Sequence, residues 1–92
     1  MDAKGFEDAL KRDRYDEILI RDAAPGSGLN EHSHSFDVRV LILEGSFFVA
    51  TQSGRTECSA GETFELKAGQ SHTEGAGPAG ARLLIGRRHT AR

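Results

Sequence analysis

Short apolar runs separated by glycine-containing turns constrain the fold of this chain more than any other feature. The runs cover residues 37–44, 47–51, 55–59, 63–66 and 82–86. Tight turns are expected at 44–46, 53–54 and 60–62, and a Gly/Pro/Ala loop at 75–80. Strands of this length, repeated at short intervals, are typical of an all-β sandwich or barrel.

The N-terminal segment has a different pattern. Phe6, Ala9 and Leu10 follow the i, i+3, i+4 spacing of one helical face, which predicts a short helix over residues 5–13. A first strand is expected over residues 15–21, and a loop over 24–28. No linker divides the chain, so we expect one domain over residues 1–92, with an N-terminal helical arm (1–14) and a β-barrel (about 16–86).

Composition excludes several classes of protein. The net charge is −2, and the charged residues, 28% of the chain, include both signs, which argues against a dedicated nucleic-acid binder. No apolar stretch is long enough for a membrane span, and the start of the chain lacks the apolar core of a signal peptide. One cysteine, Cys58, excludes an intrachain disulfide, and we expect it to be inert. A cytoplasmic location and a solvated basic end (Arg82, Arg87, Arg88, His89 and Arg92) are expected.

Three of the four histidines form a candidate metal site. His32 and His34 are two residues apart, so on a strand both imidazoles point to one face. His72 follows a glycine-containing turn further along the chain. Three imidazoles on neighbouring strands provide most of the ligands of a transition-metal site.

Two spaced motifs resemble those of the cupin superfamily of small β-barrels. In the first, Gly26 is followed after five residues by His32-Ser33-His34, and the motif closes at Gly45. In the second, Gly61 is followed by residues 67–69 and then by His72. The resemblance covers residues 16–86. It implies a double-stranded β-helix, or jelly-roll barrel, with one short N-terminal helix.

The resemblance also implies a cofactor and partners. It places a divalent transition metal (Fe, Mn, Ni, Zn or Cu) inside the barrel, held by His32, His34 and His72, and a small-molecule ligand beside it. It further implies a homodimer, because small cupins often pair sheet to sheet. Neither a nucleic acid nor a membrane is expected as a partner.

The chain departs from the cupin motifs at three positions, one of which affects the site. Val38 stands where a metal-ligating Glu is usual, while Lys67 and Ala76 replace a Pro and an Asn. Either Asp37 or Glu74 can supply the missing carboxylate, or three histidines can act without one. Asp37 needs a bulge to reach the face of His34, whereas Glu74 shares the face of His72 on a regular strand.

Two further residues are candidates for substrate binding. Arg39 lies in an apolar strand, where a buried charge needs a partner. It either faces the cavity and binds a substrate carboxylate, or pairs with an acid such as Glu65 or Asp37, or reaches solvent. Phe48 belongs to a Phe-Phe pair whose rings face opposite ways, so one ring can face the barrel mouth or a partner. The alternative is that these rings pack in the core or in a dimer interface.

Three functions fit these residues. The first is a small metalloenzyme acting on a small polar molecule, with oxygenase- or isomerase-like chemistry. The second is a non-enzymatic ligand- or metal-sensing domain that acts through a protein partner. The third is a structural cupin that has lost its metal, which Val38 makes possible. The fold itself does not choose between them.

Overall fold

The computed structural model describes residues 1–89, apart from the side chain of Leu29, so Arg92 in the expected basic end lies outside the described residues. One helix precedes six strands: α1 (Ala3–Arg12), β1 (Glu17–Ala23), β2 (Gly28–His32), β3 (Asp37–Thr51), β4 (Gly54–Ser59), β5 (Thr63–Leu66) and β6 (His72–Arg88). The prediction of an all-β chain with one short N-terminal helix is confirmed.

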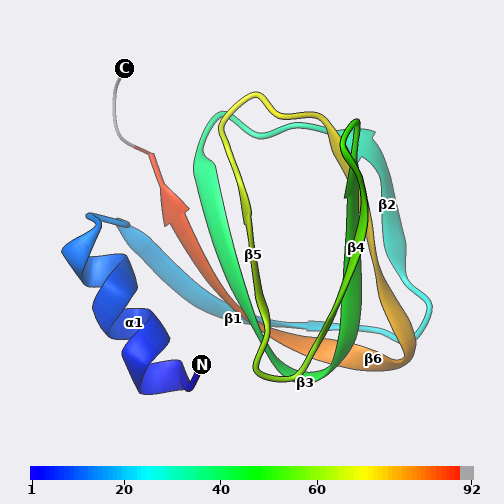
Figure 1. Ribbon diagram of the computed structural model, residues 1–92, viewed down its shortest axis with the longest axis horizontal. Helices are drawn as coiled ribbons and strands as arrows, with labels where there is room; N and C mark the ends of the chain where they lie inside the picture. The colour runs from blue at the N-terminus through cyan, green and yellow to red at the C-terminus, as the bar shows by residue number, and fades with distance from the viewer. Residues whose placement is uncertain (90–92) are drawn as a thin grey trace.

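Two long strands, β3 and β6, run antiparallel and hold the barrel together (Figure 1). Their halves that contain 37–45 and 81–88 pair with each other, with β5 on one side and β1 on the other. Their other halves pair over 47–50 and 73–76, and there β4 and β2 are the outer strands. Both long strands therefore cross from one sheet to the other, as the strands of a jelly roll do.

The long strands cross between the sheets at glycines, which have no side chain. Gly45 and Gly80 have φ angles of 77° and 78°, in the left-handed region that favours glycine. A Cβ atom on Gly45 would also overlap the carbonyl oxygen of Gly80. Two predictions are wrong here, since residues 44–46 form a bend inside β3 and residues 75–80 lie inside β6. Glycine allows the bend with only a local shift of register, so strand pairing resumes on both sides.

Two apolar clusters form on opposite faces of the sheet that contains β1, β5 and the paired segments 37–45 and 81–88. One fills the space between the sheets and contains Val38, Val40, Ile42, Phe47, Leu83 and Ile85. The other lies under α1, where Phe6 and Leu10 of the helix meet Leu41 and Leu84. Gly86 lets the helix approach closely, because a Cβ atom there would lie 2.5 Å from Leu10. Within residues 1–89, no helix has the length and apolarity to cross a membrane.

Candidate metal centre

Four side chains that can bind a metal converge at one end of the barrel: His32, His34, His72 and Glu74. One ligand atom from each lies within 4.8 Å of the others. His32 ends β2 and is the register partner of His72 at the start of β6, so strand pairing brings them together. His34 lies in the segment after β2, and its ring centroid is 4.8 Å from that of His32 and 5.2 Å from that of His72.

Backbone carbonyls orient two of the imidazoles. His32 Nδ1 lies 2.7 Å from the Asn30 oxygen, and His72 Nδ1 lies 3.0 Å from the Gln70 oxygen. A carbonyl only accepts, so each Nδ1 donates and each neutral ring keeps its lone pair on Nε2. The Nε2 atom of His32 is buried without a hydrogen-bond partner among the described residues. Metal-binding histidines are oriented in this way by their outer contacts.

Glu74 brings a carboxylate to the same point. Its Oε1 atom lies 3.0 Å from His72 Nε2 and 3.5 Å from His32 Nε2. Ligands that are each about 2.1 Å from one ion lie roughly 3.0–3.5 Å apart at angles between 90° and the tetrahedral angle. A carboxylate oxygen and an imidazole lone pair at such separations need a proton or a cation between them. These residues therefore fit a bound metal ion.

The third imidazole is kept in the form that ligates metals. Burial lowers the pKa of His34, and the neighbouring His32 and His72 lower it further. The ring of His34 stacks on Phe36, with the centroids 4.8 Å apart and the planes at 16°. A neutral imidazole has the free lone pair that a metal requires.

Of the two acids considered as a fourth ligand, the structure brings only Glu74 to the histidines. Asp37 lies on the opposite face of β3 from Val38, whose side chain lines the cavity beside His34. The Asp37 carboxylate accepts hydrogen bonds from Arg88 at 2.7 and 3.2 Å and from the Ala68 amide at 2.9 Å. No register shift turns Asp37 inward, and Val38 faces the cavity with its isopropyl group.

Arg39 is on the outer face of the barrel, away from the histidines. Its Nη1 atom is 2.5 Å from Asp13 Oδ2, and its Nε atom is 2.8 Å from Glu65 Oε2. Its guanidinium carbon also lies 4.8 Å from the centre of the Tyr15 ring. Side chains alternate along β3, so Arg39 faces outward, as Leu41 does. Of the alternatives considered for Arg39, the structure shows the ion pair with Glu65.

The Phe-Phe pair is also divided by the alternation of β3. Phe47 is buried and lines the cavities near the metal centre. Phe48 is on the other face, with the Arg55 guanidinium 3.8 Å from its ring centre. The sequence contains the signal that separates them, since Phe47 alternates with Val49, an apolar residue of the same face.

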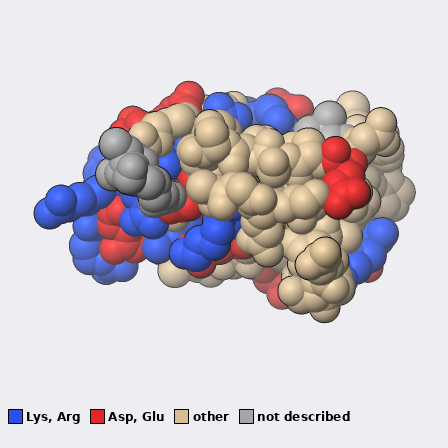
Figure 2. All heavy atoms as spheres, turned by 90° about the horizontal axis from the view of Figure 1, so that it is seen from above, with Lys and Arg blue, Asp and Glu red and all other residues tan. Residues whose placement is uncertain are grey.

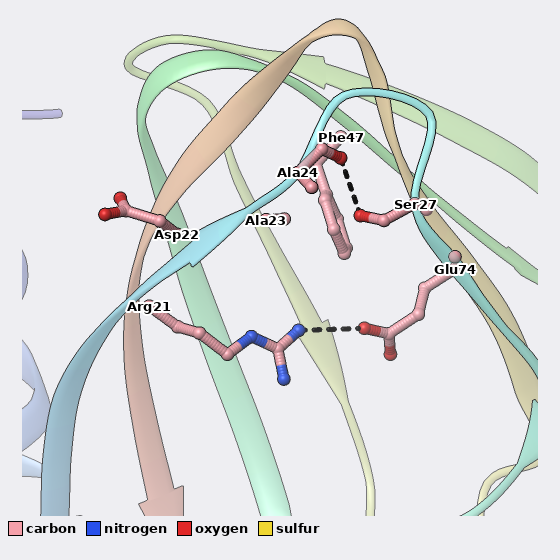
Figure 3. Close-up of a pocket in the computed structure, with 9 residues that line it drawn as sticks. Arg21, Asp22, Ala23, Ala24, Ser27, Phe47 and Glu74 are labelled. Carbon is pink, nitrogen blue, oxygen red and sulfur yellow. Dashed lines mark hydrogen bonds and ion pairs between the residues drawn. The ribbon is translucent and has the colours of Figure 1, made fainter.

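A cavity of about 50 Å³ adjoins two of the four candidate ligands. His34, Glu74, Arg21 and Arg87 supply its polar groups, and apolar side chains form the rest of its wall: Phe36, Val38, Val40, Phe47, Phe64, Leu66, Leu83 and Ile85. A neighbouring cavity of about 220 Å³ shares Arg21, Phe47 and Glu74 with it (Figure 3). Two cavities therefore border the candidate metal centre.

Sequence reasoning missed the two arginines. Arg21 and Arg87 each lie two residues from an apolar inward residue, Leu19 and Ile85, and this alternation is the signal that could have found them. The expectation of a solvated end is wrong for Arg87 and Arg88. Both belong to β6, are half-buried and pair with Glu17 and Asp37.

The face of the molecule seen in Figure 2 is unevenly charged. In Figure 2, which looks down from the top of Figure 1, basic and acidic side chains intermingle at the end that carries α1. Much of the remaining face in that view is uncharged.

Comparison with solved structures identifies the fold. A protein of unknown function from Rhizobium leguminosarum superposes with a TM-score of 0.74 at 23% identity, over 79% of this chain and 69% of that one. An RmlC-like cupin from Shewanella frigidimarina gives 0.69 at 19%, over 82% and 67%. A cupin-2 domain protein from the same organism gives 0.64 at 19%, over 74% and 65%. No protein-family model and no curated protein matches the sequence. The chain therefore has the cupin fold.

Proposed function

We propose that this chain is a metal-binding cupin in which His32, His34, His72 and Glu74 hold one divalent transition metal. The buried Nε2 atom of His32 carries the proposal, since it has no hydrogen-bond partner among the described residues and faces the Glu74 carboxylate at 3.5 Å. A buried polar atom without a partner costs free energy. A metal ion would remove that cost. Three imidazoles and one carboxylate suit Fe, Mn, Ni, Zn or Cu.

We further propose that the protein is a small metalloenzyme with oxygenase- or isomerase-like chemistry on a small polar molecule. A metal with open coordination positions polarises a substrate oxygen or activates water. The residues of the chain bind the substrate and shape its surroundings. The two cavities admit the substrate, the phenylalanine wall excludes bulk water, and the two arginines bring positive charge to the metal centre.

Metal analysis of protein purified without a metal-affinity tag tests the ligand set. We expect about one equivalent of metal in the wild type after incubation with Fe²⁺, Mn²⁺, Ni²⁺ or Zn²⁺. Replacing His32, His34 and His72 together by alanine should reduce this to less than about a tenth of an equivalent. His89→Ala is the matched control, because His89 pairs with Asp16 and is outside the cluster. Retained metal in the triple variant would contradict the ligand set.

Turnover separates the enzyme from a sensor. Oxygen uptake by the metal-loaded protein, measured with a panel of small thiols, diketones and phenols, would support an oxygenase. Product analysis of the same mixtures would detect an isomerase. A protein that holds metal and binds small molecules without turning any of them over would favour the ligand- or metal-sensing alternative.

A further inference from the structure

Two arginines border the candidate metal centre and make only long ion pairs, and the Arg87 guanidinium also lies 5.1 Å from the centre of the Phe36 ring. Arg21 comes from β1 and Arg87 from β6, and both line the small cavity. Arg21 Nη2 lies 3.5 Å from Glu74 Oε2, and in Figure 3 its side chain points toward that carboxylate. Arg87 Nη1 lies 3.5 Å from Glu17 Oε1. Neither guanidinium makes a hydrogen bond to another described residue.

The arginines on the outer face of the same sheet are held differently. Arg39 contacts its two acids at 2.5 and 2.8 Å, and Arg88 contacts Asp37 at 2.7 Å. Charge-assisted hydrogen bonds have about these lengths. The outer guanidiniums are thus committed to internal partners, whereas most donors of Arg21 and Arg87 are available to a molecule in the cavity.

With a metal bound, the net charge of the site favours an anionic ligand. This inference rests on the proposed function. A divalent ion and two guanidiniums bring four positive charges, and the carboxylates of Glu74 and Glu17 bring two negative ones. Asp22 in the wall of the larger cavity is paired with Arg82, so that pair adds no net charge. The site then has an excess of two positive charges beside an apolar wall. Charge interactions are stronger there than in water, so an anionic ligand is favoured over a neutral one.

We propose that the ligand of this site is a small organic carboxylate, bound by its carboxylate to Arg21 beside the metal, with Arg87 as a second cationic group. The planar guanidinium matches a carboxylate through two parallel hydrogen bonds. The carbon skeleton contacts Phe47 and extends into the larger cavity, which meets the smaller one at Arg21, Phe47 and Glu74.

Calorimetric titration of the zinc-loaded protein tests this, because Zn²⁺ has no redox chemistry. The probes are benzoate and its neutral analogue benzamide, propionate and propionamide, and inorganic phosphate. We expect each carboxylate to bind about tenfold more tightly than its amide. Arg21→Gln should weaken benzoate binding about tenfold or more, and Arg87→Gln by a smaller factor. The unfolding midpoint of each variant is measured alongside.

Arg82→Gln is the matched control. Its side chain is 49% exposed, against 44% for Arg21, and it lines neither of the two cavities beside the candidate metal centre. Its partners are Glu44 and Asp22, and Asp22 lines the larger cavity. The Arg82 variant loses the same charge as the Arg21 variant. Because Arg82 lines neither cavity, its replacement should leave benzoate binding unchanged. Equal binding of benzoate and benzamide, or equal effects of the Arg21 and Arg82 variants, would overturn the inference. Tighter binding of phosphate than of both carboxylates would overturn the choice of ligand class.

The zinc content of the wild type distinguishes a failure of the proposed metal site from a failure of the proposed ligand class. A wild type that takes up no zinc contradicts the proposed function, and the inference with it. A wild type that holds one equivalent of zinc, but does not prefer carboxylates, contradicts only the inference.

Discussion

The Oε1 atom of Glu74 lies 3.0 Å from Nε2 of His72, two residues earlier on the same strand. Alternation along β6 puts both side chains on the inner face. The carboxylate of the site therefore comes from β6, whereas β3 presents Val38 to the cavity.

Replacing Glu74 by Gln should lower the metal affinity by about tenfold or more, because a neutral amide oxygen is a weaker ligand than a carboxylate. Competition with a chromogenic chelator measures this directly. Glu57→Gln is the control, since its side chain is 74% exposed and lies outside the cluster. Equal affinities for the two variants would show that the histidines act without a carboxylate.

Stability should fall at acid pH through the outer ion pairs. The Arg39 guanidinium lowers the pKa of Asp13 and of Glu65 by hydrogen bonding to each carboxylate. A lowered pKa in the folded state means that this stabilisation is present above the unfolded pKa values of about 4 and is lost as the pH falls through the folded values.

Arg39→Gln should thus flatten the acid side of the stability profile and lower the free energy of unfolding near neutral pH. Urea unfolding between about pH 3 and 7 measures both effects. Arg55→Gln, an exposed arginine whose acid is also exposed, should leave the slope unchanged. An unchanged slope in the Arg39 variant would contradict this account.

Much of the fold was predictable because turn chemistry and alternation are local. The helix over Ala3–Arg12 and the short strands follow from such patterns. The continuity of β3 and β6 was not predictable, since Gly45 reads as a turn in the sequence. Only the facing Gly80 makes it a bend between two paired segments. The contact joins residues far apart in the chain, which a local pattern does not record.

The site divides in the same way. The spacing of the two motifs indicated the three histidines, and the face of His72 made Glu74 a candidate. The choice between Asp37 and Glu74 needed a partner from a distant strand, since Arg88 pairs with Asp37 on the outer face. Arg21 and Arg87 belong to no motif, so their place beside the candidate metal centre follows only from strand pairing.

The docking of α1 should contribute substantially to stability. Leu10 is fully buried and packs over Gly86. Leu10→Ala should therefore cost about 2–5 kcal/mol in the free energy of unfolding, as buried leucines do when a cavity is left. Ile20→Ala is the control, because Ile20 is 57% exposed and its truncation should cost less than about 0.5 kcal/mol. Similar losses in urea unfolding would show that α1 is not packed as described.

Cys58 should react slowly with thiol reagents in the folded protein. It is 3% exposed and faces Phe47 inside the barrel, and burial, aided by Glu62, raises its pKa, so little of the reactive thiolate forms. With Ellman's reagent at about pH 8, we expect labelling to be on the order of 100-fold slower than in urea. A Cys58→Ser, Ser59→Cys variant moves the thiol to an exposed position of the same strand and should be labelled rapidly. Labelling of the native thiol at the unfolded rate would mean that β4 opens readily, and that this wall of the barrel is not closed in solution.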